Sequence, residues 1–308
     1  MTTNAIELTG VTKQFGQHKA VSNLDLEIPE GAIYGFIGPN GSGKTTTIRM
    51  ILRIFHPDEG TISVLGNTRG DCADDRVGYL PEERGLYRKM KVRDLLRYYG
   101  RLKGYSDTDA AIDHWLEKLG AGDWGKKKIE SLSKGMAQKV QFISAIIAEP
   151  QLLILDEPFT GLDPVNLELL RNAILEIRER GTTIIFSTHE MDAAERLCDT
   201  VFMIHNGEKV LDGSLERIQR EYPADQVKIR VAEGETLPGQ LPGVEQTERQ
   251  GAYTLLRLSD PSASHDLLSH VSDRCRLEHF ELIRPSLHNI FIRIAGPVTS
   301  EPATMASA

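Results

Sequence analysis

A loop near the N-terminus has the residue types and spacing of a phosphate-binding loop. Its residues match the pattern G-x-x-x-x-G-K-[ST]: Gly38, Pro39, Asn40, Gly41, Ser42, Gly43, Lys44 and Thr45. Glycines let the backbone curl so that successive N–H groups point at phosphate oxygens, and a helix starting at the loop adds the positive end of its dipole. Lys44 is expected to reach the β- and γ-phosphates, and the Thr45 hydroxyl to bind Mg²⁺. Thr46 completes the expected nucleotide-binding set.

Two adjacent carboxylates follow a second apolar segment. Asp156 and Glu157 directly follow residues 152–155, which read Leu-Leu-Ile-Leu. Asp156 is expected to hold Mg²⁺ through its water shell, and Glu157 to orient and deprotonate an attacking water. Two acids at a strand end can also be a capping feature. In the same chain as a phosphate loop, they predict a catalytic site.

Three further motifs lie in a fixed order around these carboxylates. Residues 132–136 read Leu-Ser-Lys-Gly-Met before an apolar helix, residues 161–163 read Gly-Leu-Asp, and His189 follows a short apolar strand. A Ser-x-Gly turn alone is a helix cap, and an isolated His after a strand is usually structural. Together with the phosphate loop and the carboxylates, however, the series resembles the ATPases of the ATP-binding-cassette (ABC) family over roughly residues 5–215.

The resemblance implies a role for each matching residue. His189 is the switch histidine, which holds the γ-phosphate and Glu157 in line. Asp163 of the D-loop communicates the nucleotide state of one ATP site to the other. Phe15 is the aromatic that stacks on adenine, for which a flat apolar partner suffices; the alternative is a core Phe near a turn. The signature motif acts on ATP bound to a partner subunit, and its residues are Ser133, Lys134, Gly135 and Met136.

The sequence departs from the family pattern at two points. Glu82 stands where the family usually has Gln. Its carboxylate can still coordinate Mg²⁺, but its charge repels phosphate more when the metal is absent. The signature reads Leu-Ser-Lys-Gly-Met rather than Leu-Ser-Gly-Gly-Gln, while Ser133 and the Gly135 N–H are retained. We expect activity to survive both changes.

The elements that position these residues predict an α/β fold in two domains. Residues 1–220 alternate β-rich runs and helical patterns, with buried strands near 32–37, 151–155 and 182–186 and a hairpin near 201–211. The resemblance adds a helical signature subdomain and an antiparallel β part to the parallel core sheet. Residues 221–296 predict a small α+β domain, with strands at 227–231 and 253–258, a helix at 264–271 and two further short elements near 277–282 and 287–294. The last residues, 297–308, are expected to be disordered.

Composition limits the class of protein and its expected location. Apolar residues make up 40% of the chain and charged residues 26%, as in ordinary globular proteins, and the net charge of −8 argues against nucleic-acid binding. The basic run 126–128 is by itself typical of a solvated face. The three cysteines, Cys72, Cys198 and Cys275, are an odd and sparse set without a C-x-x-C pair, which fits a reducing compartment and gives no zinc or disulfide framework. Since the sequence has no signal peptide and no run able to span a bilayer, we expect a cytoplasmic protein held peripherally at the membrane by a partner.

The sequence thus predicts an ATP-hydrolysing subunit that requires ATP and Mg²⁺ and powers a separate multi-span permease. Residues 80–87 and 286–293 resemble the subgroup that serves exporters of sodium, drugs or related compounds. The family's sites form in a head-to-tail dimer, with a second copy or a homologous cassette. The alternatives are a soluble ABC-class ATPase that remodels a cytosolic assembly and a regulator that binds ATP without turnover. The cargo is not encoded here, and the C-terminal unit could dimerise cassettes, bind a regulator or cover an edge of the first domain.

Overall fold

The computed structural model describes residues 3–68, 74–83, 85–222 and 224–295. The chain divides between Ser214 and Leu215 into two compact units. The helix α7 (Leu215–Glu221) groups with the second unit, whereas the sequence analysis places most of it in the first domain. The expected tail, 297–308, lies outside the described residues. No helix in the described part is long and apolar enough to cross a membrane.

A six-stranded sheet forms the centre of the first unit, in the order β5-β6-β7-β3-β8-β9. Its strands are β5 (Val77–Leu80), β6 (Leu152–Asp156), β7 (Thr183–Thr188), β3 (Ile33–Ile37), β8 (Thr200–His205) and β9 (Glu208–Ser214). All pairs are parallel except the β8–β9 hairpin. Every residue of β3, β6 and β7 is buried, as continuous apolar runs covered on both faces require. Because parallel strands end at one edge of a sheet, the segments after β3, β6 and β7 meet there.

A second, antiparallel sheet in this unit has the order β2-β1-β4. It comprises β1 (Asn4–Phe15), β2 (His18–Pro29) and β4 (Glu59–Val64). Apolar residues of this sheet, such as Leu8 and Leu26, share one core with Phe36 of β3 and Ile48 of α1 (Lys44–Ile51). This shared core fixes the end of β1 beside the helix that follows the phosphate loop.

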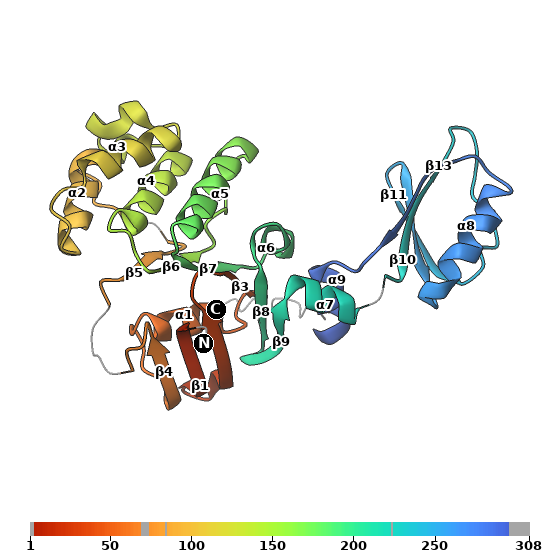
Figure 1. The fold of residues 1–308 in the computed structure, drawn as a ribbon, viewed down its shortest axis with the longest axis horizontal. Helices are drawn as coiled ribbons and strands as arrows, with labels where there is room; N and C mark the ends of the chain where they lie inside the picture. The colour runs from red at the N-terminus through yellow and green to blue at the C-terminus, as the bar shows by residue number, and fades with distance from the viewer. Residues whose placement is uncertain (1–2, 69–73, 84, 223, 296–308) are drawn as a thin grey trace, which may run out of the picture. The chain divides into compact units, whose positions relative to one another are not determined.

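Helices make up the third part of the unit. Figure 1 shows α2 (Val92–Leu102), α3 (Asp109–Lys118) and α4 (Lys134–Ile146) gathered at the end of the unit away from β1 and β4. Two short 3-10 helices, Gly122–Lys126 and Ile129–Ser131, connect α3 to α4. The helices α5 (Pro164–Glu179) and α6 (Met191–Leu197) flank β7 in the chain. The expected combination of a parallel core, a helical part and an antiparallel part is therefore confirmed.

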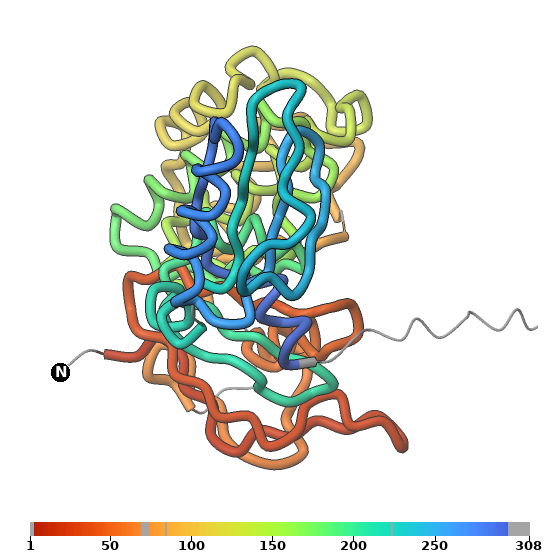
Figure 2. Tube along the Cα trace, turned by 90° about the vertical axis from the view of Figure 1, so that its right-hand side faces the viewer, coloured from red at the N-terminus to blue at the C-terminus, as the bar shows by residue number. Residues whose placement is uncertain are grey.

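The second unit has its own sheet and core. Its antiparallel strands have the order β11-β12-β10-β13: β11 (Val244–Gln250), β12 (Tyr253–Leu258), β10 (Gln226–Val231) and β13 (Leu277–Ile283). The helix α8 (Ser264–Ser272) lies beside this sheet (Figure 2), with Leu267 and Val271 packed against Val227 and Leu256. The last element in the described part of this unit is α9 (Leu287–Ala295). The α+β composition matches the expectation, although β11 was not expected.

Candidate nucleotide-binding and catalytic site

The predicted phosphate loop connects buried β3 to α1 and is shaped by two glycines. A Cβ on Gly38 would lie 2.2 Å from the carbonyl oxygen of Ile204, and one on Gly43 would lie 2.5 Å from that of Ala20. Gly43 also has φ of 112°, in the region that favours glycine. Side chains at these positions would push the loop off the backbone beneath it, so the glycines are required by contact as well as by conformation.

The turn of the β8–β9 hairpin supports this loop from below. The Gly207 N–H donates to the carbonyl of Ser42 at 2.9 Å, and the Ser22 N–H donates to the carbonyl of Gly207 at 2.8 Å. Ile204, which lies under Gly38, belongs to the same hairpin. The sequence analysis predicted the hairpin but not this contact, because it joins residues far apart in the chain.

Lys44 lies at the start of α1 with its side chain folded back over the loop. Its Nζ donates to the carbonyls of Gly38 at 2.6 Å and Pro39 at 3.1 Å. Burial lowers the pKa of the Lys44 ammonium, and the carboxylates of Glu157, Asp156 and Glu82 oppose that shift. A buried cation facing three carboxylates provides an anchor for phosphate between groups that bind metal or water.

One pocket of about 240 Å³ joins most of the predicted site. It extends from Phe15 at the end of β1, past the phosphate loop, to the carboxylates after β6. Phe15 is 44% exposed and meets Phe55 edge-on at 5.5 Å between ring centroids, so it is not a core residue. The lining residues are Phe15, His18, Ala20, Asn40, Gly41, Ser42, Gly43, Lys44, Thr45, Thr46, Glu82, Asp156 and Glu157.

Asp156 is held at the end of β6 by a neighbour on β7. The Ser187 hydroxyl donates to Asp156 Oδ1 at 2.8 Å, and the two residues are paired in the sheet. The side chain of Asp156 is buried, which raises the pKa of its carboxyl; the bond from Ser187 opposes this shift, and Glu157 and Glu82 add to it. The protein thus keeps an acidic side chain at a position where the loss of water disfavours its charged form.

Glu157 is the most constrained acid of the site. Its backbone has φ of 51°, unusual for a residue with a side chain. The Thr188 hydroxyl donates to Oε2 at 3.2 Å, the His189 N–H donates to Oε1 at 2.9 Å, and His189 Nδ1 lies 2.7 Å from Oε1. Since a carboxylate only accepts hydrogen bonds, Nδ1 donates here, which leaves Nε2 for another partner. The structure therefore couples His189 directly to Glu157, although His189 does not line the pocket with Phe15 and Lys44.

Two glutamines of α4 anchor the segments that carry the acids. Gln141 Nε2 donates to the carbonyls of Glu83 at 3.2 Å and Pro81 at 3.5 Å, on either side of Glu82. Gln138 Nε2 donates to the carbonyl of Pro158 at 2.6 Å, next to Glu157. Neither glutamine is among the site residues predicted from the sequence. Their spacing of one helical turn in a mostly buried helix was the available signal.

The signature residues lie at the N-terminus of α4. Ser133 is the N-cap, and its hydroxyl accepts a 3.3 Å bond from the Met136 N–H. Ser133 and Lys134 are exposed, and Gly135 and Met136 are partly exposed. Asp163 caps α5, and the hydrogen bond from the Asn166 N–H holds the pKa of its carboxyl below the usual range. None of these residues lines the pocket with Lys44; Lys134 lines a neighbouring hollow with Glu82, Asp156 and Glu157.

The residues present fit a polyphosphate and a hard cation. The Ser42 hydroxyl is buried among loop N–H groups without a partner in the described part of the chain, and the loop backbone excludes side chains at Gly38 and Gly43. No group of three or more His, Cys, Asp or Glu side chains able to hold a metal occurs among the described residues. The predicted Mg²⁺ site rests instead on oxygen atoms of Thr45, Asp156 and Glu82, the ligand type that Mg²⁺ prefers.

Comparisons with known proteins agree with this geometry. Residues 21–160 match the family model described as "ABC transporter", and residues 213–295 match "ATP-binding protein DrrA1-3-like, C-terminal domain". An uncharacterised ABC transporter ATP-binding protein of Bacillus subtilis is 43% identical over 290 residues, 94% of this chain and 97% of that protein. A Nod factor export ATP-binding protein of Burkholderia lata is 35% identical over 299 residues, covering 94% and 97%.

A solved structure of an ATP-binding subunit of an ABC transporter superposes with a TM-score of 0.67 and 30% identity, covering 70% of this chain and 92% of the other. The fold and the site define an ABC-type ATPase. The chain belongs to the ATP-binding subunits of ABC transporters, and like them it binds and hydrolyses ATP.

Proposed function

We propose that this chain hydrolyses ATP with Mg²⁺ in a head-to-tail dimer of cassettes, and that closure of the dimer drives a separate membrane permease, which exports its cargo. One observation supports the proposed dimer. The pocket around Lys44 contains the loop and the carboxylates, while Ser133 and Gly135 lie outside it at an accessible helix N-terminus. A helix N-terminus favours phosphate, so a second cassette that covers the pocket would supply the missing donors.

Each residue of the site then has a defined task. The loop N–H groups and Lys44 hold the β- and γ-phosphates, and Phe15 stacks on the base. Glu157, fixed by Thr188 and His189, accepts a proton from the attacking water, and His189 Nε2 faces the γ-phosphate. Mg²⁺, held by Thr45, Asp156 and Glu82, would neutralise charge on the phosphate oxygens. Asp163, next to the signature, links one site to the other.

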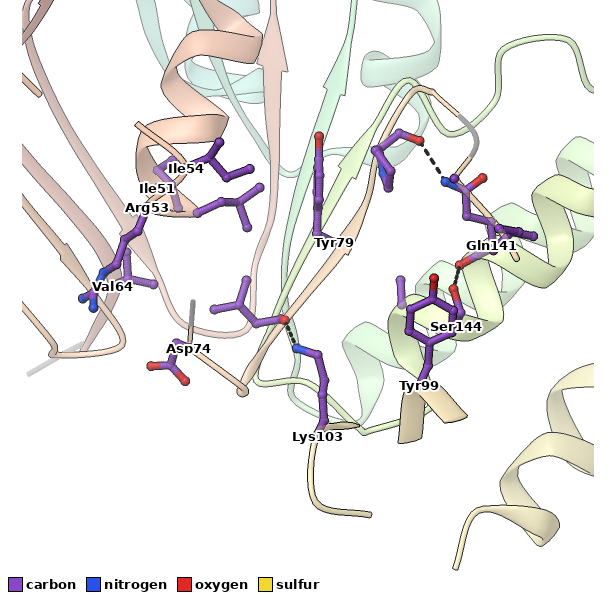
Figure 3. Close-up of a pocket in the computed structure, with 16 residues that line it drawn as sticks. Ile51, Arg53, Ile54, Val64, Asp74, Tyr79, Tyr99, Lys103, Gln141 and Ser144 are labelled. Atoms are coloured by element: carbon purple, nitrogen blue, oxygen red, sulfur yellow. Dashed lines mark hydrogen bonds between the residues drawn. The ribbon is translucent and has the colours of Figure 1, made fainter. Parts of the chain in front are cut away.

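A second pocket, beside the segment that carries Glu82, suits a docked segment of the permease. This groove of about 320 Å³ is mainly apolar. Figure 3 shows Ile51 at the end of α1, Ile54 just after it, Tyr79 on β5, Tyr99 on α2 and Gln141 on α4 around it. Gln141 also holds the carbonyls on both sides of Glu82. A segment seated in the groove would therefore respond to movement of Glu82 through one side chain.

The direction of transport is proposed from the relatives. A protein that matches nearly the full length of this chain is named an export ATP-binding protein, and the match extends through the second unit. We accordingly assign this chain to an exporter and place it at the cytoplasmic face of the membrane, bound to its permease. Its cargo is left unassigned because substrate contacts belong to the permease.

The variant Glu157→Gln tests the dimer and the catalytic base together. We expect it to bind ATP, to form a stable dimer with ATP and Mg²⁺, and to hydrolyse ATP about 100-fold or more slowly, as loss of a general base predicts. Light scattering and phosphate release measure the two outcomes. Glutamine retains the size of the side chain and an acceptor for the Thr188 and His189 donors.

The control is Glu179→Gln, an exposed acid at the end of α5, which should behave as the unchanged protein. Rapid turnover by Glu157→Gln would rule out this base, and a monomer with bound ATP would rule out the dimer. Gentle purification from native membranes tests the permease. A stoichiometric multi-span protein supports the proposal, whereas a soluble non-membrane partner would favour an ATPase that remodels a cytosolic assembly.

A further inference from the structure

Two basic segments that are distant in the sequence lie side by side in the first unit. The Val92 N–H donates to the carbonyl of Lys127 at 3.0 Å, and the Ile129 N–H donates to that of Met90 at 3.0 Å. The Glu130 N–H donates to the carbonyl of Arg88 at 2.9 Å, and Lys91 pairs with Lys128 as an antiparallel bridge. We call residues 88–92 and 126–130 the basic ribbon.

The basic ribbon carries a concentrated positive charge in an acidic protein. Its charged side chains are six cations and one acid, Glu130, whereas the whole chain has a net charge of −8. All six cations are exposed, and the ion pair recorded for them in the described residues is Lys128 with Glu130 at 3.6 Å. The cations are Arg88, Lys89, Lys91, Lys126, Lys127 and Lys128. A run of three lysines is ordinary. Two basic runs held within a Debye length of each other, however, add their charges into one positive surface potential.

Two tyrosine side chains adjoin this charge. Tyr87 precedes Arg88, is 53% exposed and contacts the ring of Tyr98 at 5.6 Å between centroids. Tyr98 is 38% exposed, and Leu102, one turn further along α2, is 58% exposed. The two tyrosine rings are thus exposed together as a contacting pair. Tyrosines beside lysines and arginines are the combination found at the headgroup level of membranes, where the ring meets the apolar boundary and the cation meets phosphate.

We propose that the basic ribbon, with Tyr87 and Tyr98, binds directly to an anionic phospholipid surface, independently of the permease. The ribbon's cations do not line the groove of Figure 3, so a permease segment seated in the groove would leave them free. A duplex nucleic acid would use the cations but leave the exposed rings of Tyr87 and Tyr98 uncovered, which favours lipid. Direct attachment would hold the ATPase at the membrane even when its permease is absent.

Vesicle flotation of the purified full-length chain, without permease, tests the proposal. We expect binding to vesicles of phosphatidylcholine and phosphatidylglycerol in equal parts, no binding to phosphatidylcholine alone, and release as salt rises. The combined variant Lys91→Gln, Lys126→Gln and Lys128→Gln should bind about 100-fold more weakly, because each cation near an anionic surface contributes on the order of a fivefold factor.

The matched control removes the same charge elsewhere, through Arg249→Gln, Arg274→Gln and Arg276→Gln. These exposed arginines lie in the second unit, and their loss should leave vesicle binding unchanged. Unaltered ATP hydrolysis by both combined variants shows that they are folded. Three results would overturn the proposal: no binding to anionic vesicles at low salt, equal weakening in both combined variants, or binding of a DNA duplex without binding of vesicles.

Discussion

Asp156 illustrates how the site keeps a charged group at some cost to stability. Its side chain is buried at the end of β6 beside the carboxylates of Glu157 and Glu82. The hydrogen bond from Ser187 and the charge of Lys44 compensate this burial only in part. Burial raises the pKa of its carboxyl above 3.8. The folded protein therefore binds a proton at Asp156 more readily than the unfolded chain does. Stability consequently falls as pH rises from 3.8 through the raised pKa.

Asp156→Asn should remove this cost. We expect ATP hydrolysis to fall about 100-fold or more, because a proposed metal ligand is lost. Without nucleotide and metal, the melting temperature should rise, since the amide still accepts the bond from Ser187 and carries no charge. The gain should be present at neutral pH and shrink as pH falls toward 3.8, where the carboxyl of the unchanged protein becomes protonated.

Thermal melting across pH, compared with phosphate release, measures both effects. Asp107→Asn is the control, because it makes the same chemical change on an exposed aspartate and should alter neither quantity. A lower melting temperature for Asp156→Asn at neutral pH would contradict the account of a buried, poorly compensated charge.

The sequence predicted these acids but not their surroundings. The pattern of an apolar run followed by Asp156 and Glu157 is local, so it can be recognised in one segment. Ser187 and Thr188 lie on the next strand of the sheet, and pairing between strands cannot be derived from their own residue types. The positions that set the pKa and the orientation of a site are therefore harder to predict than the positions that perform its chemistry.

At the scale of elements, the β8–β9 hairpin controls the phosphate loop through its turn. Gly207 has φ of 80°, and a Cβ there would lie 2.9 Å from the carbonyl oxygen of Ala20. We expect Gly207→Ala to shift the turn, to disturb the bond from its N–H to Ser42, and to weaken ATP binding about tenfold. Calorimetric titration with ATP analogues measures the affinity.

Gly66→Ala is the matched control. Gly66 has φ of 76°, but a Cβ there would meet nothing within 4 Å. In both variants the alanine is held in the left-handed region at a cost of about 1 kcal/mol, so both should have a lower melting temperature, while Gly207→Ala alone should lose affinity for ATP. Equal affinities in the two variants would mean that the hairpin does not support the loop.

Prediction of elements succeeded where a segment is apolar on all sides or bounded by a motif. The strands near 32–37, 151–155 and 182–186 and the hairpin near 201–211 are confirmed within a few residues. The β11 strand was missed because all its residues except Val244 are exposed and polar, so it lacks alternation. Residues 287–294 were expected only as a short element; buried Leu287, Ile290 and Phe291 give the one-sided spacing of a helix.

At the scale of the whole chain, the two units have separate cores. One cluster joins the sheets of the first unit around Phe36 and Phe202, and another joins α8 to the sheet of the second unit around Leu267. The clusters share no residue. Units with independent cores are able to unfold in separate steps, and the nucleotide pocket lies wholly in the first.

We therefore expect two unfolding transitions in calorimetry, and we expect ATP to raise the temperature of the one that belongs to the first unit. A ligand present at about 100 times its dissociation constant stabilises the unit that binds it by about 2.7 kcal/mol and leaves an independent unit unchanged. Leu267→Ala truncates a fully buried side chain of α8. It should reduce the free energy of unfolding of the second unit by about 2–5 kcal/mol and lower only the temperature of the ATP-insensitive transition. Leu170→Ala, equally buried in α5, should lower only the ATP-sensitive one. A single transition that responds to ATP and to both variants would instead show that the second unit stabilises the ATPase, and its role would have to be sought in the conformation of the nucleotide site.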